Sequence, residues 1–182
     1  MFERLLERLA QILEKAGIPY MVIGGQAVLL YGEPRLTREI DLTLALGPKE
    51  ISKLTPLLIP LQLKVLVPRP DQFVEETLVL PCQNPDSGIR VDFIFSLSPY
   101  ERQAMGRVRK VPMGKSEVHF ASLEDVVIQK IVSGRLRDLE DVRMILLKKP
   151  PYDRAYVDKW LGDFEKALER PLLPILRNLT NN

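Results

Sequence analysis

The stretch that decides the fold runs from Tyr20 to Leu42 and reads YMVIGGQAVLLYGEPRLTREIDL. A short apolar run over residues 18–23 ends in Gly24-Gly25, and Glu39-Ile40-Asp41 begins 14 residues after that pair. Residues 39–46 alternate between polar and apolar side chains, which is the period of a strand with one buried face. The stretch therefore predicts two strands joined through a glycine turn and a short helix, with two carboxylates on one face of the second strand.

Glu39 and Asp41 stand at positions i and i+2, so they share a strand face and lie roughly 6 to 7 Å apart along it. Such a pair can bind one or two Mg²⁺ ions, which take oxygen ligands and keep several waters. Asp92, within the alternating residues 89–95, is the candidate third ligand on an adjacent strand. Metal held by the three carboxylates would activate an attacking hydroxyl and stabilise a leaving pyrophosphate. The alternative interpretation is a set of solvated acids on an outer strand face.

The glycine pair and the loop after it are candidates for phosphate binding. Gly24 and Gly25 carry no Cβ, so their backbone can approach a phosphate, and a following helix start would direct N–H groups at the anion. Arg35 and Thr37 lie in the loop that enters the carboxylate strand. They either contact the same phosphates or hold that loop in place. The alternative for the glycine pair is an ordinary turn.

Four charged residues in the C-terminal part are candidates for a supporting role. Lys130 falls on the apolar face of a helix predicted from Leu123, where it either reaches a triphosphate as a point charge or extends its stem along the rim of the core. Asp138 and Asp141 share a face of the next helix. They are expected to orient Lys130 or Arg135 or to contact metal-bound water, and the alternative is an ion-paired helix start.

The remaining pattern predicts an α/β chain with a mixed sheet and a helical C-terminal part. We expect a core over residues 1–121 and helices that pack on it over residues 122–182. The predicted helices cover residues 2–16, 26–31, 48–58, 100–105, 122–133, 136–147, 153–170 and 171–178. The predicted strands cover residues 18–23, 39–46, 61–67, 76–80, 89–95 and 117–120. The basic residues Arg107, Arg109, Lys110 and Lys115 are expected in a solvated loop, and the alternative is a path for a nucleic-acid acceptor.

Composition excludes several classes of protein. The chain has 182 residues, 46% of them hydrophobic, and a net charge of only +2, so it is not a polycation that binds nucleic acid through overall charge. The single cysteine, Cys82, rules out an internal disulfide and a cysteine-cluster metal site. His119, the only histidine, is expected to be structural. No apolar run approaches the ~20 residues that span a bilayer, so we expect a cytoplasmic protein without a membrane partner.

Three blocks carry a family resemblance: residues 20–42, then Arg90-Val91-Asp92, then residues 122–142, with their lysine, arginine and spaced aspartates. Together they resemble polymerase-beta-type nucleotidyltransferases, in particular the AbiEii-type, or minimal, nucleotidyltransferases of prokaryotic toxin–antitoxin systems. The resemblance covers roughly residues 1 to 148 and implies a nucleotidyltransferase fold. It also implies transfer of a nucleoside monophosphate from an NTP, with Mg²⁺ or Mn²⁺. The acceptor would be a tRNA end, a protein side chain or a small molecule, and an antitoxin protein would be a further partner.

One residue departs from the pattern of the family. Such proteins usually carry Asp where this chain has Glu39, and the extra methylene displaces the carboxylate by about 1.5 Å. Octahedral Mg²⁺ tolerates such displacements poorly. The sequence therefore supports two hypotheses, a working transferase and a catalytically weakened protein that binds a nucleotide or a partner.

Overall fold

The computed structural model describes residues 2–33, 37–96 and 98–180. Arg35, a predicted phosphate ligand, lies outside these residues. The described chain divides into two compact units. Unit 1 comprises the residues up to Gln26 and those from Thr37 to Ala121, and unit 2 comprises the residues from Ala27 to Glu33 and from Ser122 to Thr180. Residues 27–33 thus group with the C-terminal helices, whereas the sequence prediction placed them in the core of residues 1–121.

Unit 1 is built on one mixed sheet. Within the described residues its seven strands follow the order β3-β4-β5-β2-β1-β7-β6. The strands are β1 (Tyr20–Ile23), β2 (Glu39–Leu44), β3 (Lys64–Val65), β4 (Val79–Gln83), β5 (Arg90–Phe95), β6 (Arg109–Met113) and β7 (Ser116–Phe120). The pairs β2/β5 and β1/β7 are parallel and the other neighbours are antiparallel. The expectation of a mixed α/β sheet is confirmed.

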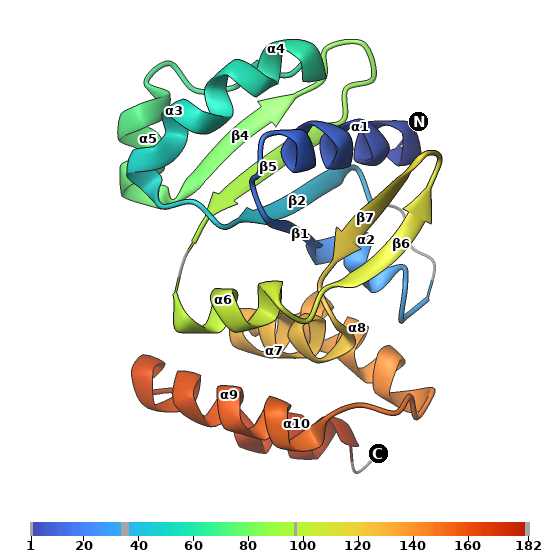
Figure 1. Cartoon of the computed structure of the whole chain (residues 1–182). Helices are drawn as coiled ribbons and strands as arrows, with labels where there is room; N and C mark the ends of the chain where they lie inside the picture. Colours follow the sequence, from blue (N-terminus) through green and yellow to red (C-terminus); the bar gives the residue numbers. More distant parts are fainter. Residues whose placement is uncertain (1, 34–36, 97, 181–182) are drawn as a thin grey trace. The chain divides into compact units, whose positions relative to one another are not determined.

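Helices cover one face of this sheet (Figure 1). They include α1 (Phe2–Lys15), α3 (Ile51–Leu54), α4 (Leu58–Leu61) and α5 (Pro70–Thr77), while α2 (Gly24–Val28) follows β1 and α6 (Pro99–Met105) follows β5. The helix α1 is amphipathic and buries one stripe of side chains, among them Leu6, Leu9 and Leu13. Val91 and Phe93 of β5 are fully buried, as are Ile40 and Leu42 of β2. Burial of this apolar face fixes the sheet register, because a shift by one residue would bring Asp41 and Asp92 into the core.

Three details of unit 1 differ from the sequence prediction. The helix expected over residues 48–58 is split into short 3₁₀ and α segments, since Pro56 and Pro60 cannot donate backbone hydrogen bonds. Residues 76 and 77, expected in a strand, end α5, which begins with Pro70 at its first turn. Two of the four basic residues expected in a loop, Arg109 and Lys110, lie in β6, which pairs with β7 in an edge hairpin.

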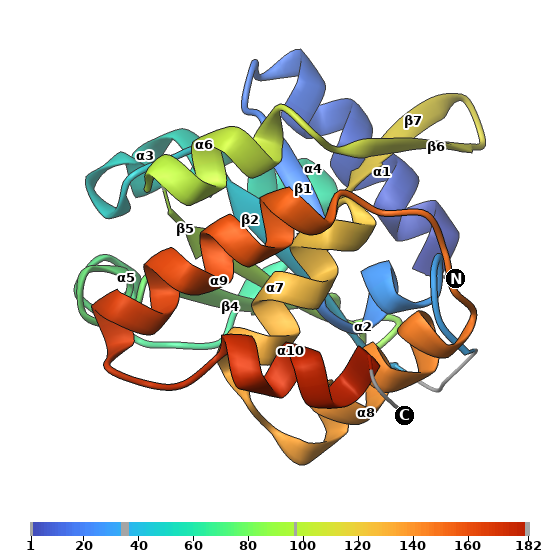
Figure 2. The ribbon, with the colours of Figure 1, turned by 90° about the horizontal axis from the view of Figure 1, so that it is seen from below.

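Unit 2 is helical, as predicted (Figures 1 and 2). It contains α7 (Leu123–Ser133), α8 (Leu136–Leu147), α9 (Arg154–Leu168) and α10 (Leu173–Thr180). The helix α7 packs against α8 and α9, and α10 packs against the same two helices. The Ser122 hydroxyl accepts from the Asp125 amide and caps α7, and Gly134 ends α7 in the left-handed conformation. Lys148 donates to the Gly32 carbonyl at 2.7 Å and so ties the 27–33 segment to the end of α8.

Candidate active site

The register between β2 and β5 brings the predicted carboxylates together. Asp41 is the direct partner of Asp92 in this parallel ladder, and Glu39 is the partner of Arg90. Neighbouring strands lie about 4.8 Å apart, and paired residues point to the same face. Asp41 and Asp92 are therefore adjacent and partly buried, whereas Glu39, at the start of its strand, is exposed. The two strands are neighbours in the sheet, as the third-ligand hypothesis requires.

Gly24 is in close contact with one of these carboxylates. It follows the last residue of β1, Ile23, which pairs with Asp41, and it has a positive φ of 62°. A Cβ at Gly24 would lie 3.1 Å from Cγ of Asp41 and still closer to its Oδ2. The missing side chain therefore makes room for the Asp41 carboxylate against the start of α2. The predicted contact of Gly24 and Gly25 with phosphate stays a prediction.

Arg90 is a site residue that the sequence argument did not single out. Its Nε donates a hydrogen bond to Oδ1 of Asp92 at 2.8 Å. The pKa of Arg90 is raised, first by this hydrogen bond and then, against the opposing effect of burial, by the negative charges of Asp92, Glu39 and Asp41. The signal was present in the sequence, because Arg90 and Asp92 are two apart and share a strand face.

A small hydrogen-bond network holds the entry to β2. Gln26, nearly buried, donates from Nε2 to the Thr37 hydroxyl at 3.1 Å and to the Glu39 carbonyl at 3.4 Å. The Thr37 hydroxyl in turn donates to the Glu39 carbonyl at 3.1 Å. Thr37 thus binds the backbone at the start of β2, and its expected role in holding the preceding loop stays a prediction. Its contact with phosphate stays a prediction, and Gln26 was not singled out as a site residue.

The donor atoms of this face suit a hard divalent cation. Asp41 and Asp92 offer adjacent carboxylate oxygens, which are the ligands that Mg²⁺ takes, and Glu39 is a third acid on the same face. Within the described ranges, however, no group of three or more His, Cys, Asp or Glu side chains is arranged to hold a metal ion. One oxygen of Asp92 is bound to Arg90 instead. The aspartate pair fits a cation, and a third protein ligand is not assembled.

In unit 2, the predicted supporting residues form one cluster. Lys130 is buried, with Nζ 2.6 Å from Oδ1 of Asp138 and 2.8 Å from Oδ2 of Asp141. Arg135 Nε and the Ser133 hydroxyl both donate to the other oxygen of Asp138. The two aspartates therefore fix the lysine between α7 and α8. Whether Lys130 also binds a triphosphate stays a prediction.

The pKa of Asp138 leads to a testable pH dependence of stability. Burial raises this pKa, but hydrogen bonds from Lys130 and Ser133 and the charges of Lys130 and Arg135 outweigh burial and lower it. A lowered folded-state pKa contributes stability above the ordinary carboxyl pKa of about 3.9, and that stability is lost as the pH falls through the lowered value. Asp138→Asn is therefore expected to destabilise the protein at pH 7 and to lose much of this effect near pH 2.

Urea unfolding of the parent and the variant at both pH values measures this difference. The control is Asp163→Asn, because Asp163 is half exposed and forms a 4.0 Å ion pair with Lys159 that contributes about 1 kcal/mol at most. An equal effect of Asp138→Asn at both pH values would contradict the assignment.

Cys82 and His119 lie in unit 1, Cys82 on β4 opposite Val91 of β5 and His119 on β7. Burial raises the pKa of the Cys82 thiol to about 12, and the charge of Asp92 adds to the shift. Such a thiol is a poor nucleophile at neutral pH. His119, which was expected to be structural, packs against two residues of unit 1. Its ring stacks on Tyr20 at a centroid distance of 5.2 Å, and its Nε2 lies 3.7 Å from Glu14.

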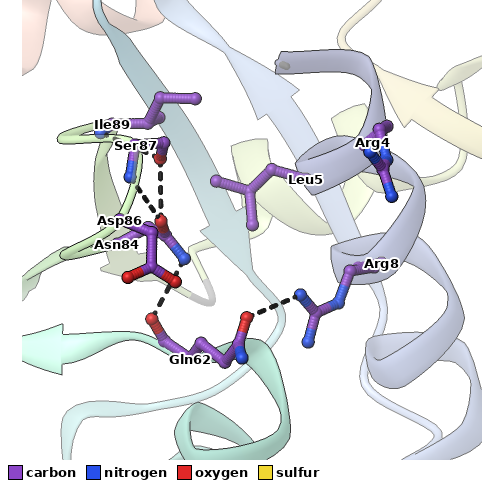
Figure 3. A pocket seen from close by; sticks show the side chains of 8 residues that line it. All are labelled: Arg4, Leu5, Arg8, Gln62, Asn84, Asp86, Ser87 and Ile89. Carbon is purple, nitrogen blue, oxygen red and sulfur yellow. Dashed lines mark hydrogen bonds between the residues drawn. The ribbon is translucent and has the colours of Figure 1, made fainter.

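A polar hollow of about 420 Å³ borders α1 and the turn between β4 and β5 (Figure 3). Its lining consists of Arg4, Leu5, Arg8, Gln62, Asn84, Asp86, Ser87 and Ile89. Several of its polar groups bind one another. Arg8 donates to Gln62 at 3.1 Å, and the buried Asn84 donates to the Gln62 carbonyl and accepts from Ser87. The hollow does not include the carboxylates of β2 and β5, so we do not assign the chemistry to it.

Comparison with known proteins agrees with this fold. No protein-family profile and no curated protein matches the sequence. Solved structures do match, and they establish the fold as that of the nucleotidyltransferases. The predicted fold class is confirmed.

Three of these structures cover most of the chain. An antigenic nucleotidyltransferase-like protein from Paracoccidioides brasiliensis has a TM-score of 0.59 and 17% identity over 98% of this chain and 91% of its own. ANT(2″)-Ia in complex with adenylyl-2″-tobramycin has a TM-score of 0.62 and 13% identity over 91% and 98%. The lincosamide antibiotic adenylyltransferase LnuA, bound to lincomycin, has a TM-score of 0.53 and 13% identity over 78% and 94%.

Across the part of the chain that the structure describes, no helix combines the length and the apolar character needed to cross a bilayer.

Proposed function

We propose that this protein is a nucleotidyltransferase, which transfers a nucleoside monophosphate from an NTP to an acceptor hydroxyl with the help of Mg²⁺ or Mn²⁺. The observation that carries the proposal is the β2/β5 register, with Asp41 directly beside Asp92 and Gly24 against Asp41. In the reaction, the acceptor oxygen forms a bond to the α-phosphorus and the bond from that phosphorus to the bridging oxygen breaks. Pyrophosphate leaves, and the hydroxyl proton passes to solvent or to a nearby carboxylate.

Each residue has a distinct role in this proposal. Asp41 and Asp92 would hold the cation, and Glu39 would add an oxygen ligand from the exposed start of β2. When bound, a divalent cation neutralises phosphate charge and makes the attacking hydroxyl more acidic. Thr37 and Gln26 fix the backbone of Glu39 and so the direction in which β2 presents its acids.

The direct test is an incubation with each α-labelled NTP, Mg²⁺ or Mn²⁺, and a panel of acceptors. The panel includes tRNA, candidate partner proteins, tobramycin and lincomycin, because the last two compounds occur in structures with the same fold. We expect label on one acceptor class together with released pyrophosphate. The enzymatic proposal fails if the folded protein transfers no label to any acceptor with either metal, and NTP binding without transfer would then favour a binding module.

A second candidate function is a catalytically weakened module that binds a nucleotide or a partner. It is favoured by Glu39, which is longer than the usual Asp, and by the engagement of Asp92 with Arg90. This candidate predicts NTP binding without transfer. An antitoxin partner is a further proposal that rests on the family resemblance, and growth arrest on expression, relieved by a co-expressed neighbouring gene, would support it.

Glu39→Asp separates the two candidates. If Glu39 is a working ligand, the shorter side chain withdraws the carboxylate by about 1.5 Å, and we expect transfer to fall about tenfold or more. The measurement is the initial rate with the preferred NTP at saturating Mg²⁺. A gain of activity from a silent parent would instead support the weakened module.

A further inference from the structure

Arg90 occupies a central place among the candidate cation ligands. It is the first residue of β5, it pairs with Glu39 across the ladder, and it shares a face with Asp92 two residues further on. Its Nε lies 2.8 Å from Oδ1 of Asp92, so one oxygen of that carboxylate already accepts a hydrogen bond. The side chain of Asp92 is only 16% exposed, whereas that of Arg90 is 44% exposed and can move into solvent.

The charges of this face explain why a cation is needed there. Asp41 and Asp92 are side by side and Glu39 adds a third negative charge, and like charges at such distances repel one another. Arg90 interacts favourably with all three carboxylates, most strongly with Asp92. The guanidinium of Arg90 therefore partly neutralises the negative charge of these carboxylates when no other cation is bound.

We propose that Arg90 is an internal counter-ion that takes the place of the divalent cation on Asp92 and is exchanged for it when nucleotide binds. This inference rests on the function proposed above. The cation and the guanidinium compete for the carboxylate of Asp92, and their positive charges repel each other. Once displaced, the planar guanidinium is suited to a phosphate of the incoming nucleotide, which it can bind through two parallel hydrogen bonds.

This exchange couples the two ligands. A cation without nucleotide binds weakly, because it displaces Arg90 from Asp92 and leaves the guanidinium with no anionic partner. When nucleotide is also present, its phosphate supplies a new partner for the displaced side chain. Arg90 is thus a specificity-determining residue that favours the cation–nucleotide complex over the cation alone.

The test measures Mn²⁺ binding to the protein alone by electron paramagnetic resonance, without substrate turnover. Arg90→Gln is expected to bind Mn²⁺ about tenfold more tightly than the parent, and Arg90→Lys, which keeps the charge, is expected to resemble the parent. Binding of a non-hydrolysable NTP at saturating Mn²⁺, where Arg90 of the parent is displaced from Asp92, is expected to weaken in Arg90→Gln. A purely structural role would not change these two affinities in opposite directions.

The matched control is Arg154→Gln. Arg154 forms a similar ion pair with Asp158 at 3.0 Å, its side chain is 45% exposed, and it lies in unit 2. Its replacement removes the same charge and should leave Mn²⁺ affinity unchanged. Thermal unfolding of each variant verifies that it is folded. If Arg90→Gln does not fold, Arg90→Lys provides the test, because a change of more than threefold in the Mn²⁺ affinity of Arg90→Lys would contradict the exchange.

The outcomes separate this inference from the proposed function. Tighter Mn²⁺ binding in Arg90→Gln, together with no transfer from any NTP by the parent protein, would support the exchange and overturn the enzymatic proposal. Unchanged or weaker Mn²⁺ binding in Arg90→Gln, or no Mn²⁺ binding by parent and variant alike, would overturn the exchange, whether or not the parent transfers nucleotide.

Discussion

Asp41→Asn is expected to lower nucleotidyl transfer about a thousandfold while leaving the protein folded. The carboxylate lies beside Asp92 and against Gly24 at the start of α2. An amide of nearly the same shape keeps the packing but removes the charge that would bind the cation. Loss of about 4 kcal/mol of charge stabilisation in the transition state corresponds to three orders of magnitude in rate.

The measurements are the single-turnover rate with labelled NTP and the thermal unfolding temperature. Removal of one of three neighbouring negative charges is expected to leave that temperature unchanged or higher, so a loss of activity cannot come from unfolding. Asp86→Asn, at an exposed acid of the β4–β5 turn, is the control and should retain full activity. Transfer within tenfold of the parent in Asp41→Asn would remove Asp41 from the catalytic site.

The second large effect is expected for Gly24→Ala. Two costs add at this position. The positive φ of 62° is a conformation that disfavours any side chain, by about 1 to 2 kcal/mol, and a Cβ would fall within contact distance of the Asp41 carboxylate. We expect both a lower free energy of unfolding and a loss of transfer of at least a hundredfold, because the carboxylate must move to make room for the methyl group.

Gly88→Ala isolates the first cost, that of the positive φ. Gly88 has a φ of 69°, and a Cβ there would meet no atom within 4 Å among the described residues. Gly88→Ala should therefore show the backbone cost alone, with normal transfer. If both variants retain the same activity, the contact between Gly24 and Asp41 has no part in catalysis.

The sequence predicted secondary structure best where the alternation of side chains and the position of glycine residues indicate the same element. The glycine pair and the alternating acids of residues 39–46 predicted β1, α2 and β2, and the helices of unit 2 were found near their expected bounds. The strand β6 was missed because a basic edge strand resembles a solvated loop in composition. The helix α5 was missed because its signal, Pro70 at a first turn, is short and carries only Val74 as a buried residue.

Within the candidate site, the sequence predicted which acidic residues share a strand face, but not which other residues they contact. The side chains of Glu39, Asp41 and Asp92 were expected to share a face, and strand register places them there. The ion pair of Arg90 with Asp92 follows from rotamers that sequence spacing does not determine. The packing of Asp41 against Gly24 depends on the pairing of β1 with β2, which a single sequence leaves open.

The chain passes from one unit to the other three times, after Gln26, before Thr37 and after Ala121. Neither unit is therefore a continuous stretch of sequence. Lys148 holds Gly32 and Glu33 from the far end of the chain, so the segment between the glycine pair and the acids depends on helices more than a hundred residues away. Replacement of the C-terminal helices would consequently also remove the partner of Gly32 and Glu33, two residues from the N-terminal part of the chain.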